Sequence, residues 1–150
     1  MDDLHLSQLQ QTLASQIPIT SAMGIEVVSW DGHSLSMRMP LEVNRNHQYS
    51  AFAGSLNALC TVVGWGTVFL YLLQKSLSRN IVIRRGTIRY LRPLRTGEIV
   101  ARGVPLDPDE LDYFLQLLES KGKSKVNIAA EIADDAGPFV TFKGSYVVLE

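Results

Sequence analysis

The stretch AFAGSLNALCTVVGWGTVFLYLL, from Ala51 to Leu73, decides the fold of this chain. No Asp, Glu, Lys or Arg occurs between Arg45 and Lys75, although charged residues make up 19% of the 150 residues. A helix rises about 1.5 Å per residue, so this one is roughly 30 Å long and apolar on nearly every face. It needs a cover on all sides, which is either lipid or a layer of protein.

A transmembrane span is the first alternative, because about twenty apolar residues are enough to cross a bilayer. Three polar side chains in the first turns argue against it, at Ser55, Asn57 and Thr61. No basic cluster directly precedes the stretch, and the segments on both sides have the pattern of one soluble sheet. We therefore predict a buried core helix and no membrane partner, with a membrane anchor as the alternative.

Length and composition favour one small domain over residues 1–150. The net charge of −1 gives no attraction to nucleic acid or to an anionic membrane. The single cysteine, Cys60, excludes an intrachain disulfide and suits a reducing compartment. The N-terminus lacks the basic and apolar regions of a secretory signal, so we expect a cytoplasmic protein. No cysteine and histidine spacing indicates a metal site.

Short periodic patterns predict the elements before the core helix. Leucines at helical spacing predict an amphipathic helix over 1–17, which Pro18 ends. Alternating residues on both sides of Asp31-Gly32 predict a hairpin with a type I′ turn, in which both central residues have positive φ. The polar segment 42–53 leads into the core helix, and Ser50 is expected to cap its first turn.

The rest of the chain predicts four more strands and a short helix. The strands cover 81–91, 98–104, 125–132 and 139–149, and a helix runs from Asp107 to Gly122. Gly86 indicates a bulge or a close backbone contact in the first of these strands, and Thr96-Gly97 forms the turn before the second. Six antiparallel strands and one apolar helix predict an α+β domain with a curved sheet wrapped around that helix. One sheet covers only part of the helix and leaves strand edges open, so we expect a homodimer.

This order of elements is that of the hotdog fold, and the motifs resemble the YiiD C-terminal domain family of thioesterase-like proteins. The resemblance covers roughly residues 17–149, and its motifs are Ile17-Pro18, Met23-Gly24-Ile25, Asn44, the helix entry 51–56, Gly64-Trp65, 122–126 and 142–147. It implies a dimer, or a dimer of dimers, that acts on a fatty acyl thioester of coenzyme A or acyl carrier protein. It implies no cofactor other than the coenzyme A of the substrate.

Thioester hydrolysis needs a polarised carbonyl, an activated water and an apolar trench for the acyl chain. Backbone amides at a helix N-terminus suit the first task, and here they lie between Phe52 and Ser55. Gly54 lets a thioester approach the backbone closely, or else packs tightly against a strand.

Related hotdog thioesterases of the PaaI kind open this helix with His-Gly-Gly and carry Asp or Glu about two turns later. The resemblance aligns Phe52 with that histidine and Thr61 with that carboxylate, so this chain lacks both catalytic groups. We expect the Thr61 hydroxyl to bond back to a helix carbonyl. The remaining catalytic candidates are Asn44, His47, Ser55 and Asn57.

Each candidate also has a structural interpretation. His47 is the general-base candidate because imidazole titrates near neutral pH, but a loop histidine is often only solvated. The two asparagines could orient the thioester or water, or serve turn and backbone bonding. Ser55 lacks a neighbouring base and could instead bond a helix carbonyl.

Arginines are interleaved along the strand 81–91. Arg85 and Arg89 share one face, where they could bind coenzyme A phosphates or remain a solvated surface, while Arg84 and Arg92 share the other. Few aromatic residues accompany them, which disfavours nucleic-acid binding. We therefore expect a thioesterase, with a non-catalytic module that binds acyl thioesters or fatty acids as the alternative. A hotdog dehydratase needs a histidine and carboxylate pair that we cannot place.

Overall fold

The computed structural model describes residues 3–77, 80–95 and 97–149. The elements are α1 (Asp3–Gln16), α2 (Ile19–Ala22), β1 (Glu26–Trp30), β2 (Leu35–Pro40), a 3-10 turn (Glu42–Asn44), α3 (Ala53–Gln74), β3 (Asn80–Tyr90), β4 (Glu98–Gly103), α4 (Pro108–Lys121), β5 (Lys123–Asp134) and β6 (Gly137–Leu149). The short α2 was not predicted, and Thr96 of the predicted turn lies outside the described residues.

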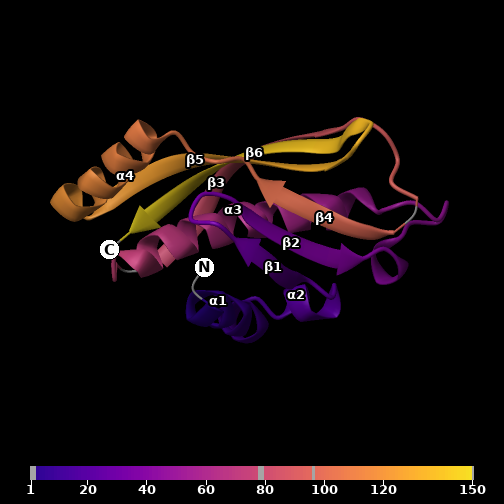
Figure 1. Cartoon of the computed structure of the whole chain (residues 1–150), viewed down its shortest axis with the longest axis horizontal. Helices are drawn as coiled ribbons and strands as arrows, with labels where there is room; N and C mark the ends of the chain where they lie inside the picture. Colours follow the sequence, from indigo (N-terminus) through magenta and orange to yellow (C-terminus); the bar gives the residue numbers. More distant parts are fainter. Residues whose placement is uncertain (1–2, 78–79, 96, 150) are drawn as a thin grey trace.

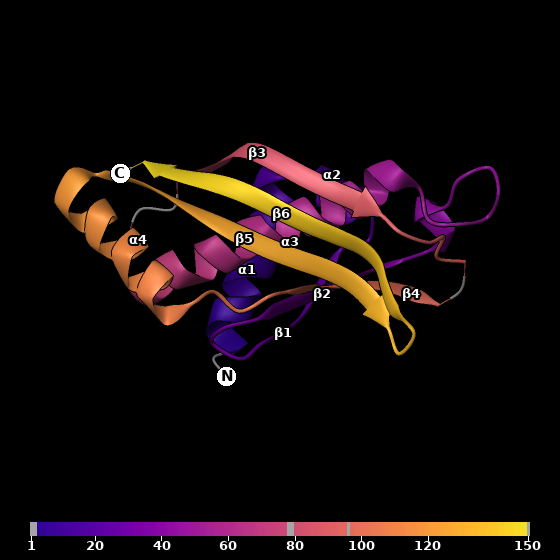
Figure 2. The same cartoon turned by 90° about the horizontal axis from the view of Figure 1, so that it is seen from above.

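Six strands form one antiparallel sheet in the order β1-β2-β4-β5-β6-β3. Figures 1 and 2 show the sheet curving around α3, which lies along its inner face, while α1 lies beneath β1 and α4 packs at the far end of β5. The predicted α+β architecture, a curved sheet wrapped around a long apolar helix, is confirmed.

The centre of the core is the middle and C-terminal part of α3. The helix is long and apolar enough to cross a membrane, yet 72% of its most apolar window is buried by the rest of the chain. Its cover comes from the inner faces of the strands and from α1, through Leu9, Leu13, Leu35, Met37, Met39, Ile99, Ile128 and Tyr146, all at most 1% exposed. The first turn differs, because Phe52, Gly54 and Asn57 are exposed.

Gly64 allows α3 to approach the sheet closely. A Cβ atom at this position would lie 2.1 Å from Tyr146 Oη and 2.5 Å from Cζ of the same ring. The Tyr146 hydroxyl donates a hydrogen bond of 2.7 Å to the Thr61 carbonyl. Burial raises the pKa of Tyr146, so the phenol stays protonated and keeps this bond.

Three local predictions were wrong. The hairpin loop between β1 and β2 has positive φ only at Gly32 among its residues, because the Asp31 carboxylate accepts the N–H groups of His33 and Ser34 and stabilises a longer loop. Ser50 does not cap α3, since its hydroxyl accepts a bond from Asn46. The bulge in β3 lies between Ile83 and Arg85, whereas Gly86 keeps its register opposite Gly144.

Replacing Gly64 by alanine tests the approach of helix and sheet. We expect G64A to lower the free energy of unfolding by about 1–3 kcal/mol, because the new methyl group overlaps the Tyr146 ring. Y146F should cost about 1 kcal/mol through the lost hydrogen bond. Urea unfolding of both single variants and the double variant should give a double-variant cost below the sum. Strict additivity would show that the two residues do not compete for the same space.

Candidate functional site at the N-terminus of α3

Two backbone hydrogen bonds fix the entry of the chain into α3. The Ala51 N–H donates to Leu94 O at 2.8 Å, and the Phe52 N–H donates to Asn44 O at 2.8 Å. The first helical bond then runs from Leu56 N–H to Phe52 O at 3.0 Å. The N–H groups of residues 53–55 precede this bond, and no side chain at the N-cap accepts them. They are therefore available to a ligand and carry the positive end of the helix dipole.

A hollow of about 360 Å³ lies beside this first turn. Its walls come from segments distant in sequence: Asn46 and Ser50 from the preceding loop, Ala53 and Leu56 from α3, and Tyr90 to Leu94 from the end of β3 and beyond. The Tyr90 hydroxyl donates to Ala53 O at 3.3 Å and so joins β3 to the helix entry. No carboxylate occurs among the described residues that line the hollow.

Asn57 and Thr61 form a hydrogen-bonded pair on α3. The Thr61 hydroxyl donates to Asn57 Oδ1 at 3.3 Å, so the expected bond to a helix carbonyl is not the one observed. Asn57 is exposed and Thr61 is half-buried. Because the amide oxygen of Asn57 accepts the hydroxyl, its NH₂ group is left as a donor for an approaching carbonyl or water.

The Phe52 ring packs against Gly54 at the helix entry. A Cβ on Gly54 would lie 2.5 Å from Cε2 of the Phe52 ring, so the glycine accommodates this ring and not a strand. The Phe52 side chain is 53% exposed, although it is a large apolar group. Ser55 is half-buried, and its hydroxyl makes no hydrogen bond to a described residue. These residues place apolar surface and unpaired donors side by side.

Asn44 is buried and serves the backbone. Its Nδ2 donates to Met23 O at 2.9 Å and to Pro40 O at 2.8 Å, while its own carbonyl holds Phe52. Both amide hydrogens are thus used to fasten the helix entry to the end of β2. Within the protomer Asn44 is a positioning residue and does not present a free donor to the hollow.

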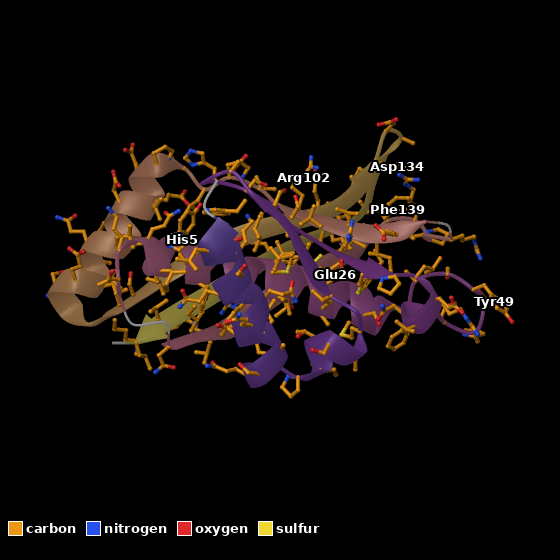
Figure 3. All side chains as sticks on the ribbon, turned by 60° about the horizontal axis from the view of Figure 1, so that its bottom comes forward. His5, Glu26, Tyr49, Arg102, Asp134 and Phe139 are labelled. Carbon is orange, nitrogen blue, oxygen red and sulfur yellow. The ribbon has the colours of Figure 1, made fainter. Side chains whose placement is uncertain are left out.

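His47 lies on an exposed loop that extends beyond the helix entry. Asn46 shapes this loop, because its Oδ1 accepts the N–H groups of Gln48 and Ser50. Figure 3 shows Tyr49 of this loop at one end of the molecule, away from the sheet. His47 does not line the hollow. The structure brings Gly54, Ser55, Asn57 and Thr61 together on the first turns of α3, directly after the N-cap Phe52, and places His47 on the preceding loop. Like His47, these five residues do not line the hollow.

Arg85 and Arg89 lie on the sheet and not at the helix entry. They pair with Ser145 and Thr141 of β6, and each lines a different hollow from the one beside α3. Arg92 does line the α3 hollow, but it is ion-paired with Asp134 and stacks on the Phe139 ring at 3.7 Å. Figure 3 labels these last two residues near the turn between β5 and β6.

Cys60 lies one turn from Asn57 but is fully buried. Burial raises the pKa of its thiol to about 12, so a thiolate nucleophile is excluded near neutral pH. Among the described residues, no group of three His, Cys, Asp or Glu side chains could hold a metal ion. The chemistry available at this end of α3 is therefore hydrogen-bond donation and apolar contact.

Comparison with known proteins places this geometry in a family. A family model described as "Putative thioesterase (yiiD_Cterm)" matches residues 6–150. The chain belongs to this thioesterase family. The helix-entry residues that carried the resemblance in the sequence lie at the N-terminus of α3, the core helix.

Solved structures show the same fold. A protein from Chlorobaculum tepidum TLS is 33% identical, with a TM-score of 0.94 over 99% of this chain and 96% of that one. A structure titled "putative thioesterase from Shewanella oneidensis" is 30% identical, with a TM-score of 0.89 over 99% and 100% of the two chains. The thioesterase HI1161 from Haemophilus influenzae, 17% identical with a TM-score of 0.70 over 96% and 90%, shares the fold.

Sequence reasoning located the helix entry but missed part of its surroundings. Asn46 and Ser50 lie within the polar segment that the sequence singled out, so their position was accessible. The position of Tyr90 at the helix entry could not be predicted from the sequence, because its contact with Ala53 depends on how far β3 extends along β6. The Asn57 and Thr61 pair could have been found from their spacing of four residues, which places both on one helix face.

Proposed function

We propose that the protein hydrolyses a fatty acyl thioester of coenzyme A or acyl carrier protein at the N-terminus of α3. The observation that carries the proposal is the open first turn of this helix, whose N–H groups face no capping side chain beside a hollow with apolar walls. These N–H groups would bind the thioester oxygen as negative charge develops on it. Family membership supports the same chemistry.

The reaction needs a water molecule but no further cofactor. The water oxygen attacks the carbonyl carbon and forms a C–O bond, the C–S bond breaks, and the water proton passes to the leaving sulfur. The products are a fatty acid and a thiol. We assign the Asn57 NH₂ group and the Thr61 hydroxyl to the orientation of the water, with Ser55 as a further donor and Phe52 as contact surface for the acyl chain. We keep His47 as the candidate base, contributed from an exposed loop.

One observation favours a second function. The described lining of the hollow contains no carboxylate, and the residue at the position where the resemblance expects one is Thr61, which lies outside this lining. A site with donors and no base binds a thioester or fatty acid without turnover. A non-catalytic module for such ligands is therefore the alternative proposal, and the two share the same site.

Measuring release of free thiol from acyl-coenzyme A of several chain lengths decides between them. We expect turnover, reduced about 10-fold to 100-fold in N57A, because a donor that acts in the transition state is lost. Exposed Asn80 of β3 supplies the matched control N80A, which should retain full activity. H47A should lose activity while H33A, on the exposed hairpin loop, should not. Saturable binding without turnover would leave only the binding module.

The proposed assembly is a homodimer that pairs β3 with its symmetry copy, in a cytoplasmic protein. β3 has 11 residues and is the last strand in the sheet order, with only β6 beside it in the described sheet. Val82 and Tyr90 on this strand are 53% and 48% exposed. A long edge strand with exposed apolar residues is expected to pair with another strand. The open part of α3 beside Tyr90 would then also lie near the partner.

Sedimentation velocity at micromolar concentration tests the dimer. The wild-type chain should sediment at twice the protomer mass of 16.7 kDa. The variant I83K should shift the population towards monomer, because a lysine on the strand edge opposes pairing. V104K, which places the same charge on exposed Val104 after β4, serves as the control and should remain dimeric. A monomeric wild-type protein would contradict the proposed assembly.

A further inference from the structure

The bulge in β3 changes where its arginines lie. On a regular strand, neighbouring residues point to opposite faces, which predicts that Arg84 and Arg85 lie on opposite sides of the sheet. Here Ile83 pairs with Tyr146 and Arg85 with Ser145, so Arg84 has no partner in β6. Both arginines line one hollow of about 250 Å³. Bulges commonly re-aim a side chain in this way next to functional sites.

This hollow is strongly cationic. Arg84 and Arg85 share it with Lys125 of β5 and Lys143 of β6, and the remaining described lining is Thr87, Asn127 and Ser145. No described carboxylate lines the hollow, and none of the four cations forms an ion pair with a described residue. All four cations are exposed, so solvent screens their mutual repulsion, but together they concentrate positive charge that attracts an anion to the hollow.

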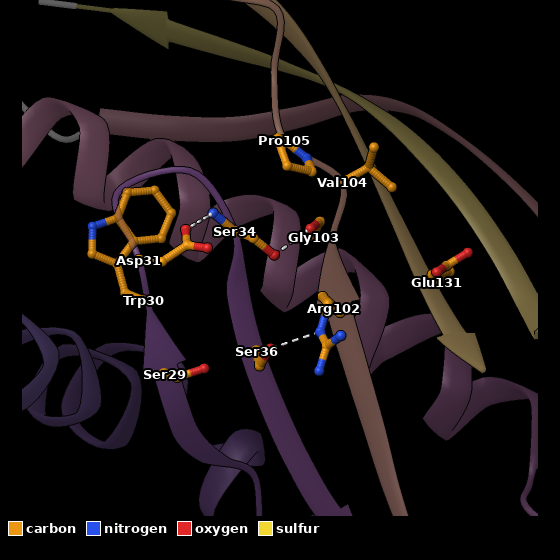
Figure 4. Close-up of a pocket in the computed structure, with 10 residues that line it drawn as sticks. All are labelled: Ser29, Trp30, Asp31, Ser34, Ser36, Arg102, Gly103, Val104, Pro105 and Glu131. Atoms are coloured by element: carbon orange, nitrogen blue, oxygen red, sulfur yellow. Dashed lines mark hydrogen bonds between the residues drawn. The ribbon is translucent and has the colours of Figure 1, made fainter. Parts of the chain in front are cut away.

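A second hollow on the sheet has a different arrangement of charges. It has a volume of about 500 Å³ and is drawn in Figure 4. Its one cation, Arg102, directs Nε to Ser36 Oγ at 3.4 Å, and the carboxylates of Asp31 and Glu131 also line the hollow. Two carboxylates therefore outnumber the one cation in the described lining around Arg102, whereas the described lining around Arg84 and Arg85 carries only positive charge.

We propose that the hollow at the β3 bulge, here called the bulge site, binds the phosphate groups of a nucleotide. Guanidinium groups match phosphate oxygens with paired N–H bonds, and lysines add compact positive charge. Pockets for whole drug-sized ligands begin at about 300 Å³, so a hollow of about 250 Å³ takes the phosphates and leaves the rest of the ligand outside. The ligand is either the coenzyme A part of the substrate or a free nucleotide, and the first source rests on the proposed thioesterase function.

β3 contributes residues both to the bulge site and to the hollow beside α3, from opposite faces of the sheet. Thr87 and Lys143 belong both to the bulge site and to a neighbouring hollow that includes Arg89, and the α3 hollow begins at Tyr90. A strand rises about 3.3 Å per residue, so Arg85 and Tyr90 are about 17 Å apart along β3. The extended arm between the sulfur and the phosphates of coenzyme A has a comparable length. The two hollows lie on opposite faces of the sheet, because Arg85 and Thr87 pair with Ser145 and Lys143 on the outer face whereas the Tyr90 hydroxyl reaches Ala53 of α3 on the inner face. One acyl-coenzyme A molecule could occupy both only by passing around the edge of β3, which the proposed dimer would close.

Titration calorimetry on the full chain tests the bulge site without requiring turnover. The probes are coenzyme A, ADP, pyrophosphate and pantetheine, each titrated at low and high salt. We expect the three phosphate compounds to bind, more weakly at high salt, and pantetheine to bind much more weakly. The double variant R84A/K143A should weaken phosphate binding by at least about tenfold. R102A, which removes an arginine from the hollow that also contains Asp31 and Glu131, should bind as the wild type does.

The outcomes separate this inference from the proposed function. Binding of ADP as tight as that of coenzyme A supports a free nucleotide, and tighter binding of coenzyme A supports the substrate. Hydrolysis of acyl-coenzyme A with unchanged KM in R84A/K143A, and no binding of pyrophosphate, would overturn the bulge site alone. Phosphate binding that R84A/K143A abolishes, without any hydrolysis, would overturn only the thioesterase. Equal loss of binding in R102A would show that general surface charge is responsible.

Discussion

The burial of α3 is the constraint on which the structure depends. A helix that is apolar on almost every face is unstable in water, and each fully buried large apolar side chain contributes about 1.5–3 kcal/mol. The curved sheet and α1 supply the protein cover, and the close approach at Gly64 brings the sheet onto the helix. This protein cover does not extend over the first turn of α3, from Ala53 to Asn57, whose N–H groups have no capping side chain. The candidate site therefore lies at the end of the core helix that its own fold does not enclose.

Much of the fold could be predicted because periodic patterns are local. The apolar run 51–73 and the alternation along β5 identify a core helix and a strand without knowledge of their partners. Features that depend on distant contacts were missed. The Asp31 loop needs the carboxylate to face two N–H groups, and the bulge at Arg84 is set by pairing with β6. Neither arrangement leaves a periodic signal in the sequence.

The same division applies to the site. The glycine and serine of the helix entry pointed to the first turn of α3, but the hollow beside it contains residues more than 30 positions away, such as Tyr90. Asn44 shows how a correct position can have a different role, because its amide holds backbone carbonyls. The site has donors and apolar surface but no described carboxylate, which makes the source of the base the main chemical question for this thioesterase family member.

The most direct test of the central claim is an ¹⁵N NMR titration with a non-hydrolysable thioether analogue of an acyl-coenzyme A that retains the carbonyl. If the first turn of α3 binds this carbonyl, the amide resonances of Ala53, Gly54 and Ser55 should shift most strongly, because hydrogen bonding acts on the N–H group itself. The Asn57 side-chain amide should shift with them. Shifts confined to other parts of the chain, with residues 53–57 unchanged at saturation, would contradict the account.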